Sequence, residues 1–428
     1  MAVSLGFHII FACVGMIMPF LMITAHYKWL KTKEDVYLEL TKIWLKGVAI
    51  LFAMGAVSGT VLSFELGLLW PAFMEHAGPI IGMPFSLEGT AFFLEAIAIG
   101  FYLYGWKHVD PWVHWLSGWV VGVAGLASGI FVVSANSWMN SPAGFDWVDG
   151  RAVNIDPVKA LFNEAWFPQA LHMSLAAFVA IGFTVAGIHA FGLLKDRHNR
   201  LHQEALKISL WFGVTASLFQ MISGDHISRH IAHRQPLKLA AAEALFETQR
   251  GAPLVIGGWP NMKEEKLDYA LEIPKALSLL AFRDVKAEVK GLNAFPKEEW
   301  PPVPIVHLSF QIMVTIGIFL SLVSCLFLYL NFFRRQLFFH RRFLKLLVFC
   351  TPLGFLAIEA GWIVTEVGRQ PWIIYGIMKT EDSLTPMPGL IFPFLLITGV
   401  YIFLSTVVIW LMIRQFRAVT HKFQTEAT

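Results

Sequence analysis

The chain has 428 residues, of which 56% are hydrophobic and only 15% are charged, and its formal net charge is +3. Soluble domains carry about a quarter charged residues, so this composition excludes an ordinary soluble protein, and the small net charge gives no reason to expect a nucleic-acid partner. The three cysteines lie in apolar segments without paired spacing, which excludes a disulfide framework and a C-x-x-C-H site for c-type haem.

Nine apolar segments are each long enough to cross a bilayer, which takes about 20 residues per helix. Backbone groups in lipid must form hydrogen bonds within their own segment, so the expected fold is an all-α integral membrane protein. We expect spans at 4–26, 43–66, 85–106, 112–135, 168–194, 205–223, 304–331, 342–366 and 389–414.

Basic residues predict the orientation of these spans. Segments 27–42, 195–207 and 332–345 hold 4, 4 and 5 Lys or Arg, whereas 67–84 holds none and 136–167 holds 2. Basic residues concentrate in cytoplasmic loops. This asymmetry predicts an N-terminus outside and a C-terminus in the cytoplasm.

The segment 224–303 is the only sizeable polar region, and this orientation places it outside the cytoplasm. Apolar residues such as Leu245 and Phe246 recur through it, which indicates an ordered module instead of a flexible linker. The chain is therefore expected to comprise helices one to six in 1–223, an extracytoplasmic loop in 224–303, and helices seven to nine with a tail in 304–428.

Ionisable side chains inside membrane spans are costly and point to function. Glu88 and Glu95 are seven residues apart, about two helical turns, so they share one face of the third span, and Glu359 and Glu366 repeat this spacing. Such carboxylates can relay protons, ligate haem or another metal, or bind cations. The alternative is a structural role against neighbouring helices, but four membrane carboxylates without a membrane Lys or Arg partner are hard to explain in that way.

Histidine and methionine in separate spans provide candidate haem ligands. His172 lies in the fifth span and Met313 in the seventh, and a His/Met pair gives low-spin haem ligation. Methionine is common here, however, with 15 in the chain, and a lone histidine is often only a hydrogen-bonded structural residue. We expect that structural role for His189. His8, in the first span, is a further ionisable candidate.

A short motif follows the eighth span, in which Pro371 favours an extended turn and Trp372 suits a membrane interface. Arg369 within it carries a planar, always charged guanidinium, which could pair with haem propionates or a quinol head group. The alternative is a snorkelling anchor at the interface.

At this motif the sequence resembles subunit I of the cytochrome bd quinol oxidases, and the similarity extends over most of the chain. The segments that carry the resemblance are Ala357–Trp362, Gly368–Trp372, Phe7-His8, Leu87–Glu95, Ser134–Met139, Lys238–Glu243 and Glu247–Gln249.

The resemblance implies a set of haem ligands. His172 and Met313 would ligate a low-spin haem b. His8, Glu88 and Glu359 would serve two high-spin haems, one a haem b and the other the oxygen-reducing haem d of typical members, or a further b-type haem.

It also implies a quinol site and a proton route. Lys238 and Glu243, in a loop of the short type, would bind quinol, while Glu88, Glu95 and Ser128 would lead protons inward from the cytoplasm. Two departures concern the haems: Gln311 stands where many members carry Arg, and Phe355 where some carry Trp.

The implied function is that of a respiratory terminal oxidase in a prokaryotic cytoplasmic (inner) membrane. It would oxidise quinol outside and reduce O₂ to water, generating membrane potential without proton pumping. A second membrane subunit, subunit II, is implied, with room for a small single-helix subunit. The alternatives are a cation or proton transporter using the membrane glutamates, and a quinol-linked electron-transfer subunit that does not reduce O₂.

Overall fold

A computed structural model describes residues 1–148 and 150–425, with side chains as far as Gln415. Within these residues nine helical segments are long and apolar enough to span a membrane, which confirms the predicted number and the all-α membrane fold. They are α1 (Ala2–Thr32), α2 (Asp35–Leu69), α3 (Pro71–Tyr104), α4 (Pro111–Asn140), α6 (Trp166–Lys195), α7 (Arg200–Arg234), α10 (Val303–Phe333), α11 with α12 (Arg341–Cys350, Leu353–Val367) and α14 (Ile391–Thr425).

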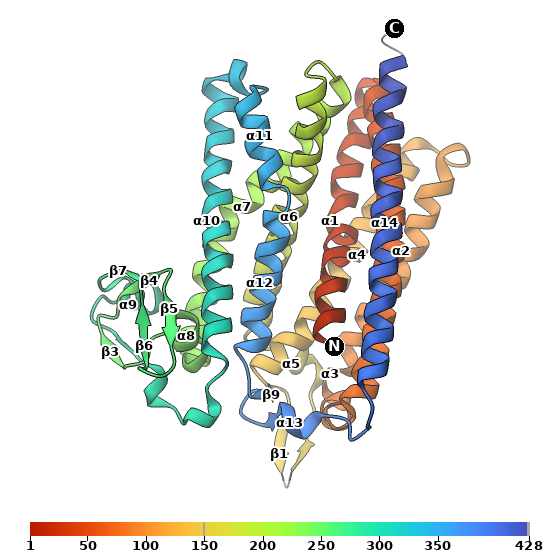
Figure 1. Ribbon diagram of the computed structural model, residues 1–428. Helices are drawn as coiled ribbons and strands as arrows, with labels where there is room; N and C mark the ends of the chain where they lie inside the picture. Colours follow the sequence, from red (N-terminus) through yellow and green to blue (C-terminus); the bar gives the residue numbers. More distant parts are fainter. Residues whose placement is uncertain (149, 426–428) are drawn as a thin grey trace.

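The long helices form one bundle, and a smaller module projects beside α10 at one end (Figure 1). The N-terminus lies toward the end of the bundle that carries this module, and the C-terminus lies at the opposite end. An odd number of spans requires the two chain ends to be separated in this way.

The module and the connections are built from short elements. Its helices are α8 (Pro236–Glu243) and α9 (Ala276–Phe282), and its antiparallel strand pairs are β3 with β8 (Gln249–Arg250, Glu288–Val289), β4 with β7 (Leu254–Ile256, Leu271–Ile273) and β5 with β6 (Trp259–Asn261, Lys266–Asp268). The remaining α-helices and strands are α5 (Pro157–Leu161), α13 (Thr380–Ser383), and the antiparallel pairs β1 with β2 (Asp146–Val148, Arg151–Val153) and β9 with β10 (Trp372–Ile374, Met378–Lys379).

Several helices extend beyond the predicted spans, and α3 and α7 are clear examples. The segment 67–84, expected to be a loop, is mostly helical, because α3 already begins at Pro71 and includes Pro79 and Pro84. Pro at the first helical position costs nothing, since its missing N–H would be unpaired there. Likewise α7 continues to Arg234, beyond the expected end of the sixth span. The predictions followed hydropathy, which does not report where a helix continues into polar sequence.

The eighth span is broken into α11 and α12 by Thr351 and Pro352. Proline lacks the N–H that would continue the helical hydrogen bonds. The Val348 carbonyl oxygen, which an N–H at position 352 would satisfy, accepts a hydrogen bond from Thr351 Oγ1 at 2.7 Å. The carbonyl oxygen of Thr351 accepts a hydrogen bond from Thr184 Oγ1 of α6, also at 2.7 Å. Gly354 then packs directly on Ala180 of α6, where an added Cβ would lie 2.4 Å from the Ala180 Cα. The break therefore fixes α12 against α6.

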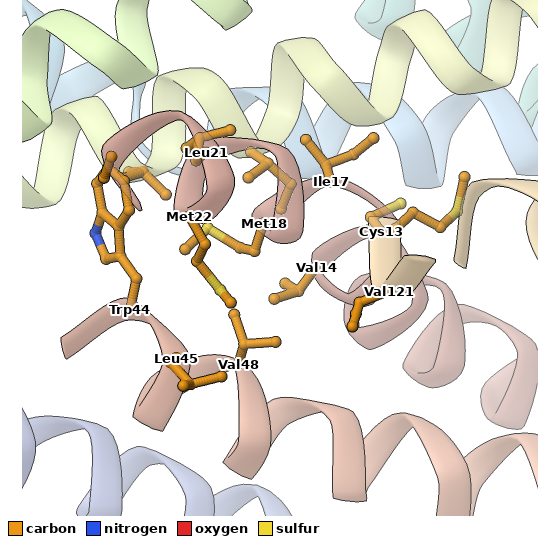
Figure 2. Packing of buried hydrophobic residues seen from close by; sticks show 14 of the residues in the cluster. Cys13, Val14, Ile17, Met18, Leu21, Met22, Trp44, Leu45, Val48 and Val121 are labelled. Atoms are coloured by element: carbon orange, nitrogen blue, oxygen red, sulfur yellow. The ribbon is translucent and has the colours of Figure 1, made fainter. Parts of the chain in front are cut away.

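The packing of α1 against α2 forms part of the largest apolar core. Met18 and Met22 of α1 face Leu45 and Val48 of α2 (Figure 2). Helix α1 also packs on α4, α6 and α12, so it is surrounded by other helices over much of its length. Side chains on α1 can thus contact several partner helices.

Helices α6 and α7 approach each other most closely at a pair of glycines. A Cβ added at Gly182 would lie 2.4 Å from the Gly213 Cα and 3.0 Å from the Ser209 carbonyl oxygen. These are backbone atoms, which cannot rotate away. Small residues allow this kind of backbone contact between membrane helices.

We therefore predict that Gly182→Ala destabilises the protein by about 1–3 kcal/mol, the usual cost of overpacking. The measurement is the thermal unfolding midpoint of the purified protein in detergent. Gly317→Ala is the matched control, because nothing lies within 4 Å of a Cβ added there in another long helix. Equal midpoints for the two variants would contradict the close contact.

Candidate functional site

His8 of α1 is oriented by α2. Its Nδ1 is 2.9 Å from the hydroxyl oxygen of Ser58. The ring also faces Gly59, where an added Cβ would lie 3.0 Å from the His8 Cε1. A serine holds one ring nitrogen, and a glycine leaves space for the ring.

Glu359 of α12 contacts α1 on the side opposite to His8. An added Cβ at Gly6 would lie 3.0 Å from its Oε2. Residues 6 and 8 are about 200° apart around a helix, so His8 and Glu359 flank different sides of α1. Glu359 Oε1 is buried without a hydrogen-bond partner in the described residues. A buried polar atom left in this way is costly unless a ligand binds it.

The two glutamates of α3 both face α4. Ser128 Oγ donates to Glu88 Oε1 at 3.2 Å. Glu95 is 5% exposed, and its carboxyl packs against Gly125 of α4. A Cβ added at Gly125 would lie 3.0 Å from Glu95 Oε1. Gly15 of α1 approaches the same oxygen, at 3.4 Å from its own added Cβ. The predicted common face of Glu88 and Glu95 is thus directed at one face of α4.

His172 of α6 is oriented by α7. Its Nδ1 is 2.9 Å from Ser223 Oγ, and its Nε2 is 3.1 Å from the side-chain nitrogen of Gln220. Gly224 faces the ring, with an added Cβ 3.6 Å from Cε1. His172, like His8, therefore combines a serine partner with a facing glycine.

Met313 of α10 contacts α12. An added Cβ at Gly361 would lie 3.0 Å from the Met313 sulfur. Gly361 and Glu359 are two residues apart, so they face opposite sides of α12. Helix α12 therefore presents Gly361 to the sulfur on α10 and Glu359 to α1.

A chain of polar side chains connects the module to the motif after α12. Lys238 Nζ donates to Asn140 Oδ1 at 2.6 Å, and Asn140 Nδ2 donates to Asn136 Oδ1 at 3.2 Å. Asn136 Nδ2 donates to one oxygen of Glu366. Arg369 Nη2 donates to the other oxygen at 2.7 Å. Lys238 and Arg369 thus lie at the two ends of one hydrogen-bonded chain.

The burial of Arg369 and its ion pair contradict two of the expectations drawn from the sequence. Arg369 is 1% exposed, so the alternative of a snorkelling anchor is wrong. It also pairs with Glu366, so the expectation that this carboxylate has no cationic partner is wrong as well. The partner comes from the turn immediately after the span. Arg369 Nη1 is buried without a partner in the described residues, and an anionic group such as a haem propionate fits it.

Lys238 and Glu243 lie at opposite ends of α8, and both are buried. Burial, with Arg369 nearby, lowers the pKa of Lys238 to about 7. Burial raises the pKa of Glu243 to about 8, although its carboxyl accepts the backbone amide of Val255. Glu243 Oε2 has no hydrogen-bond partner within the described chain. Both side chains can exchange protons near neutral pH.

Some polar partners were not predicted. Asn140 and Gln235 connect α4 to α8, since Gln235 Nε2 donates to the Asn140 carbonyl oxygen at 2.9 Å. The one sequence signal for this connection was the four-residue spacing of Asn136 and Asn140, which places both on the same face of α4. His189 is hydrogen-bonded between Trp44 and His202, at 3.1 and 2.8 Å, as expected of a structural histidine.

Comparisons with known proteins agree with this arrangement. A putative cytochrome bd menaquinol oxidase subunit I of Bacillus subtilis (strain 168) is 37% identical, covering 97% of this chain and 94% of its own length. Subunit 1 of the cytochrome bd-II ubiquinol oxidase of Escherichia coli (strain K12) is 27% identical, covering 99% and 96%. The solved bd oxidase of Geobacillus thermodenitrificans superposes with a TM-score of 0.92 at 38% identity, covering 97% and 96%.

A membrane bundle in which half-buried His, Met and Glu side chains face glycines, and in which a buried arginine has one unpaired donor nitrogen, has the features of a membrane haem protein. The sequence model of the family described as cytochrome bd terminal oxidase subunit I matches residues 1–420. The chain belongs to this family. It is a haem-bearing, multi-pass subunit of a respiratory quinol oxidase, and the comparisons give no support to the transporter alternative.

The pKa of Glu243 gives a direct prediction. A buried carboxyl with a pKa of about 8 stays protonated at neutral pH and ionises above it. The infrared band of a protonated carboxyl should therefore disappear with a midpoint near pH 8, and Glu243→Gln should lack this component. Glu247→Gln, at an exposed position of the same module, is the control. A Glu243 component that titrates near pH 4.5 would contradict the effect of burial.

Proposed function

We propose that His172 and Met313 ligate a low-spin haem b, while His8, Glu88 and Glu359 serve two high-spin haems. Bound haem supplies the iron that carries electrons and reduces O₂. The facing glycines support this assignment, because they leave the donor atoms unobstructed by a facing side chain. Since His8 and Glu359 flank different sides of α1, we assign them to different irons. The oxygen site takes haem d or a b-type haem.

We further propose that quinol binds at Lys238 and Glu243. The observation that carries this proposal is the hydrogen-bonded chain from Lys238 to Arg369. It joins the quinol loop to a buried guanidinium with an unpaired donor, where a propionate fits. The protein can therefore fix the distance between quinol and haem with its own side chains. Glu243 offers a carboxyl oxygen without a partner in the described residues, which can form a hydrogen bond with a quinol hydroxyl.

The proposed proton route uses the face shared by α3 and α4. Glu95 takes up protons from the cytoplasmic side and Glu88 delivers them to the oxygen site. Seven residues at ~1.5 Å each separate the two positions by about 10 Å, too far for direct transfer. The contact between Ser128 and Glu88 supports a hydroxyl as one bridging group.

In the proposed topology the N-terminus and the quinol module lie outside a prokaryotic cytoplasmic (inner) membrane. Protons are released outside on quinol oxidation and consumed from inside on O₂ reduction. Charge is thereby separated without pumping. Subunit II completes the enzyme, and a small single-helix subunit is a further candidate partner.

The low-spin assignment is tested by Met313→Leu, which keeps volume but removes the sulfur ligand. We expect the reduced low-spin b-type absorption to be lost or converted to high spin at unchanged protein yield. Met387→Leu, at an exposed methionine, should keep the native spectrum. An unchanged spectrum in Met313→Leu would remove Met313 from the ligand set.

The proton route is tested by Glu95→Gln, which keeps shape and hydrogen bonding but cannot ionise. O₂ consumption should fall at least tenfold, equivalent to ~1.4 kcal/mol in the barrier, while quinol still reduces the low-spin haem. Glu75→Gln, at an exposed position of the same helix, should keep native turnover. Native turnover in Glu95→Gln would return Glu95 to a structural role.

A further inference from the structure

His307, near the start of α10, is fully buried and bonded through both ring nitrogens. Its Nδ1 is 2.8 Å from the carbonyl oxygen of Ala242, and its Nε2 is 3.1 Å from that of Gly257. Carbonyl oxygens only accept hydrogen bonds, so the ring nitrogens are the donors in these contacts. The two contacts connect the start of α10 to the end of α8 and to the turn after β4.

Gln311 lies one helical turn further along the same face of α10. Its side-chain oxygen accepts the Gly257 amide at 3.0 Å, and its side-chain nitrogen donates to the Val255 carbonyl oxygen at 3.3 Å. Gly257 has a φ of +69°, a backbone conformation that favours glycine. His307 and Gln311 together hold β4 and the turn that follows it.

The same hydrogen bonds lead to Glu243, the proposed quinol-binding residue. The Val255 amide donates to the carboxyl of Glu243, and Ala242 immediately precedes Glu243 in α8. Glu243 is thus fixed through its own backbone and through β4, and both connections lead back to His307 or Gln311. The carboxyl oxygen Oε2 remains without a partner in the part of the chain described.

We propose that His307 is a positioning residue for quinol oxidation, holding Ala242 and Gly257 so that the free oxygen of Glu243 is aimed at a quinol hydroxyl. This inference rests on the proposed role of Glu243. His307 itself does not touch quinol. Its removal releases the β4 turn from α10 and loosens the carboxyl that meets the substrate.

The test uses the complete oxidase with its second subunit and a soluble short-chain quinol. His307→Phe keeps a ring of similar size but loses both donors, so the quinol KM should rise about tenfold, a loss of ~1.4 kcal/mol. His307→Gln keeps one donor group and should show an intermediate rise of about threefold. Haem content and the dithionite-reduced spectrum should stay native in both. His233→Phe, at an exposed histidine near the same module, is the control with an expected native KM.

The Glu243→Gln variant distinguishes failure of the positioning role of His307 from failure of the proposed quinol site. If it impairs quinol oxidation and His307→Phe has a native KM, the positioning role is overturned and the quinol site stands. If Glu243→Gln is also native, the proposed quinol site fails with it. If His307→Phe does not assemble, His307→Gln decides by its KM at native haem content. Loss of haem in both variants would overturn the proposal, because His307 would then serve assembly.

Discussion

Removing polar groups from water is the constraint on which this structure depends. A buried polar atom without a partner costs several kcal/mol in an apolar medium, and lipid offers no water to supply one. Intramembrane polar side chains here are bonded to the backbone of their own helix, as Thr41 is, or across helices, as in the chain from Asn136 through Glu366 to Arg369. The exceptions include Glu359 Oε1 and Arg369 Nη1 within the described residues. Because such exceptions are costly, they indicate where a ligand completes the structure.

Glycine provides the second structural device. Between α6 and α7 it allows backbone contact, as at Gly182 and Gly213. Elsewhere it faces a proposed haem ligand, as Gly361 faces the Met313 sulfur and Gly59 faces His8. In both cases the absent Cβ determines how closely a neighbour can approach. The same residue type thus serves helix packing and ligand orientation, and only the facing atoms distinguish the two uses.

Sequence patterns predicted features that depend on one helix at a time. Span number follows from apolar length, and the common face of Glu88 and Glu95 follows from helical periodicity. The partner of Glu366 was missed, because Arg369 returns to it through a turn outside the apolar window. The break at Pro352 was missed because the surrounding hydropathy stays high, and the hydrogen bond from Thr184 that anchors this break comes from another helix. Contacts between helices cannot be read from the periodicity of either helix alone.

Helix α12 is where these constraints meet. Its first turn is fixed to α6 by the Thr351 carbonyl and by Gly354, and its last turn is fixed to α4 through Glu366. Between these anchors, Glu359 and Gly361 face opposite sides, toward α1 and α10. A helix held at both ends resists rotation, so neither side can turn without disturbing the other. Its short length between two fixed ends therefore favours a constant separation between the proposed low-spin and high-spin positions, which electron transfer between fixed sites requires.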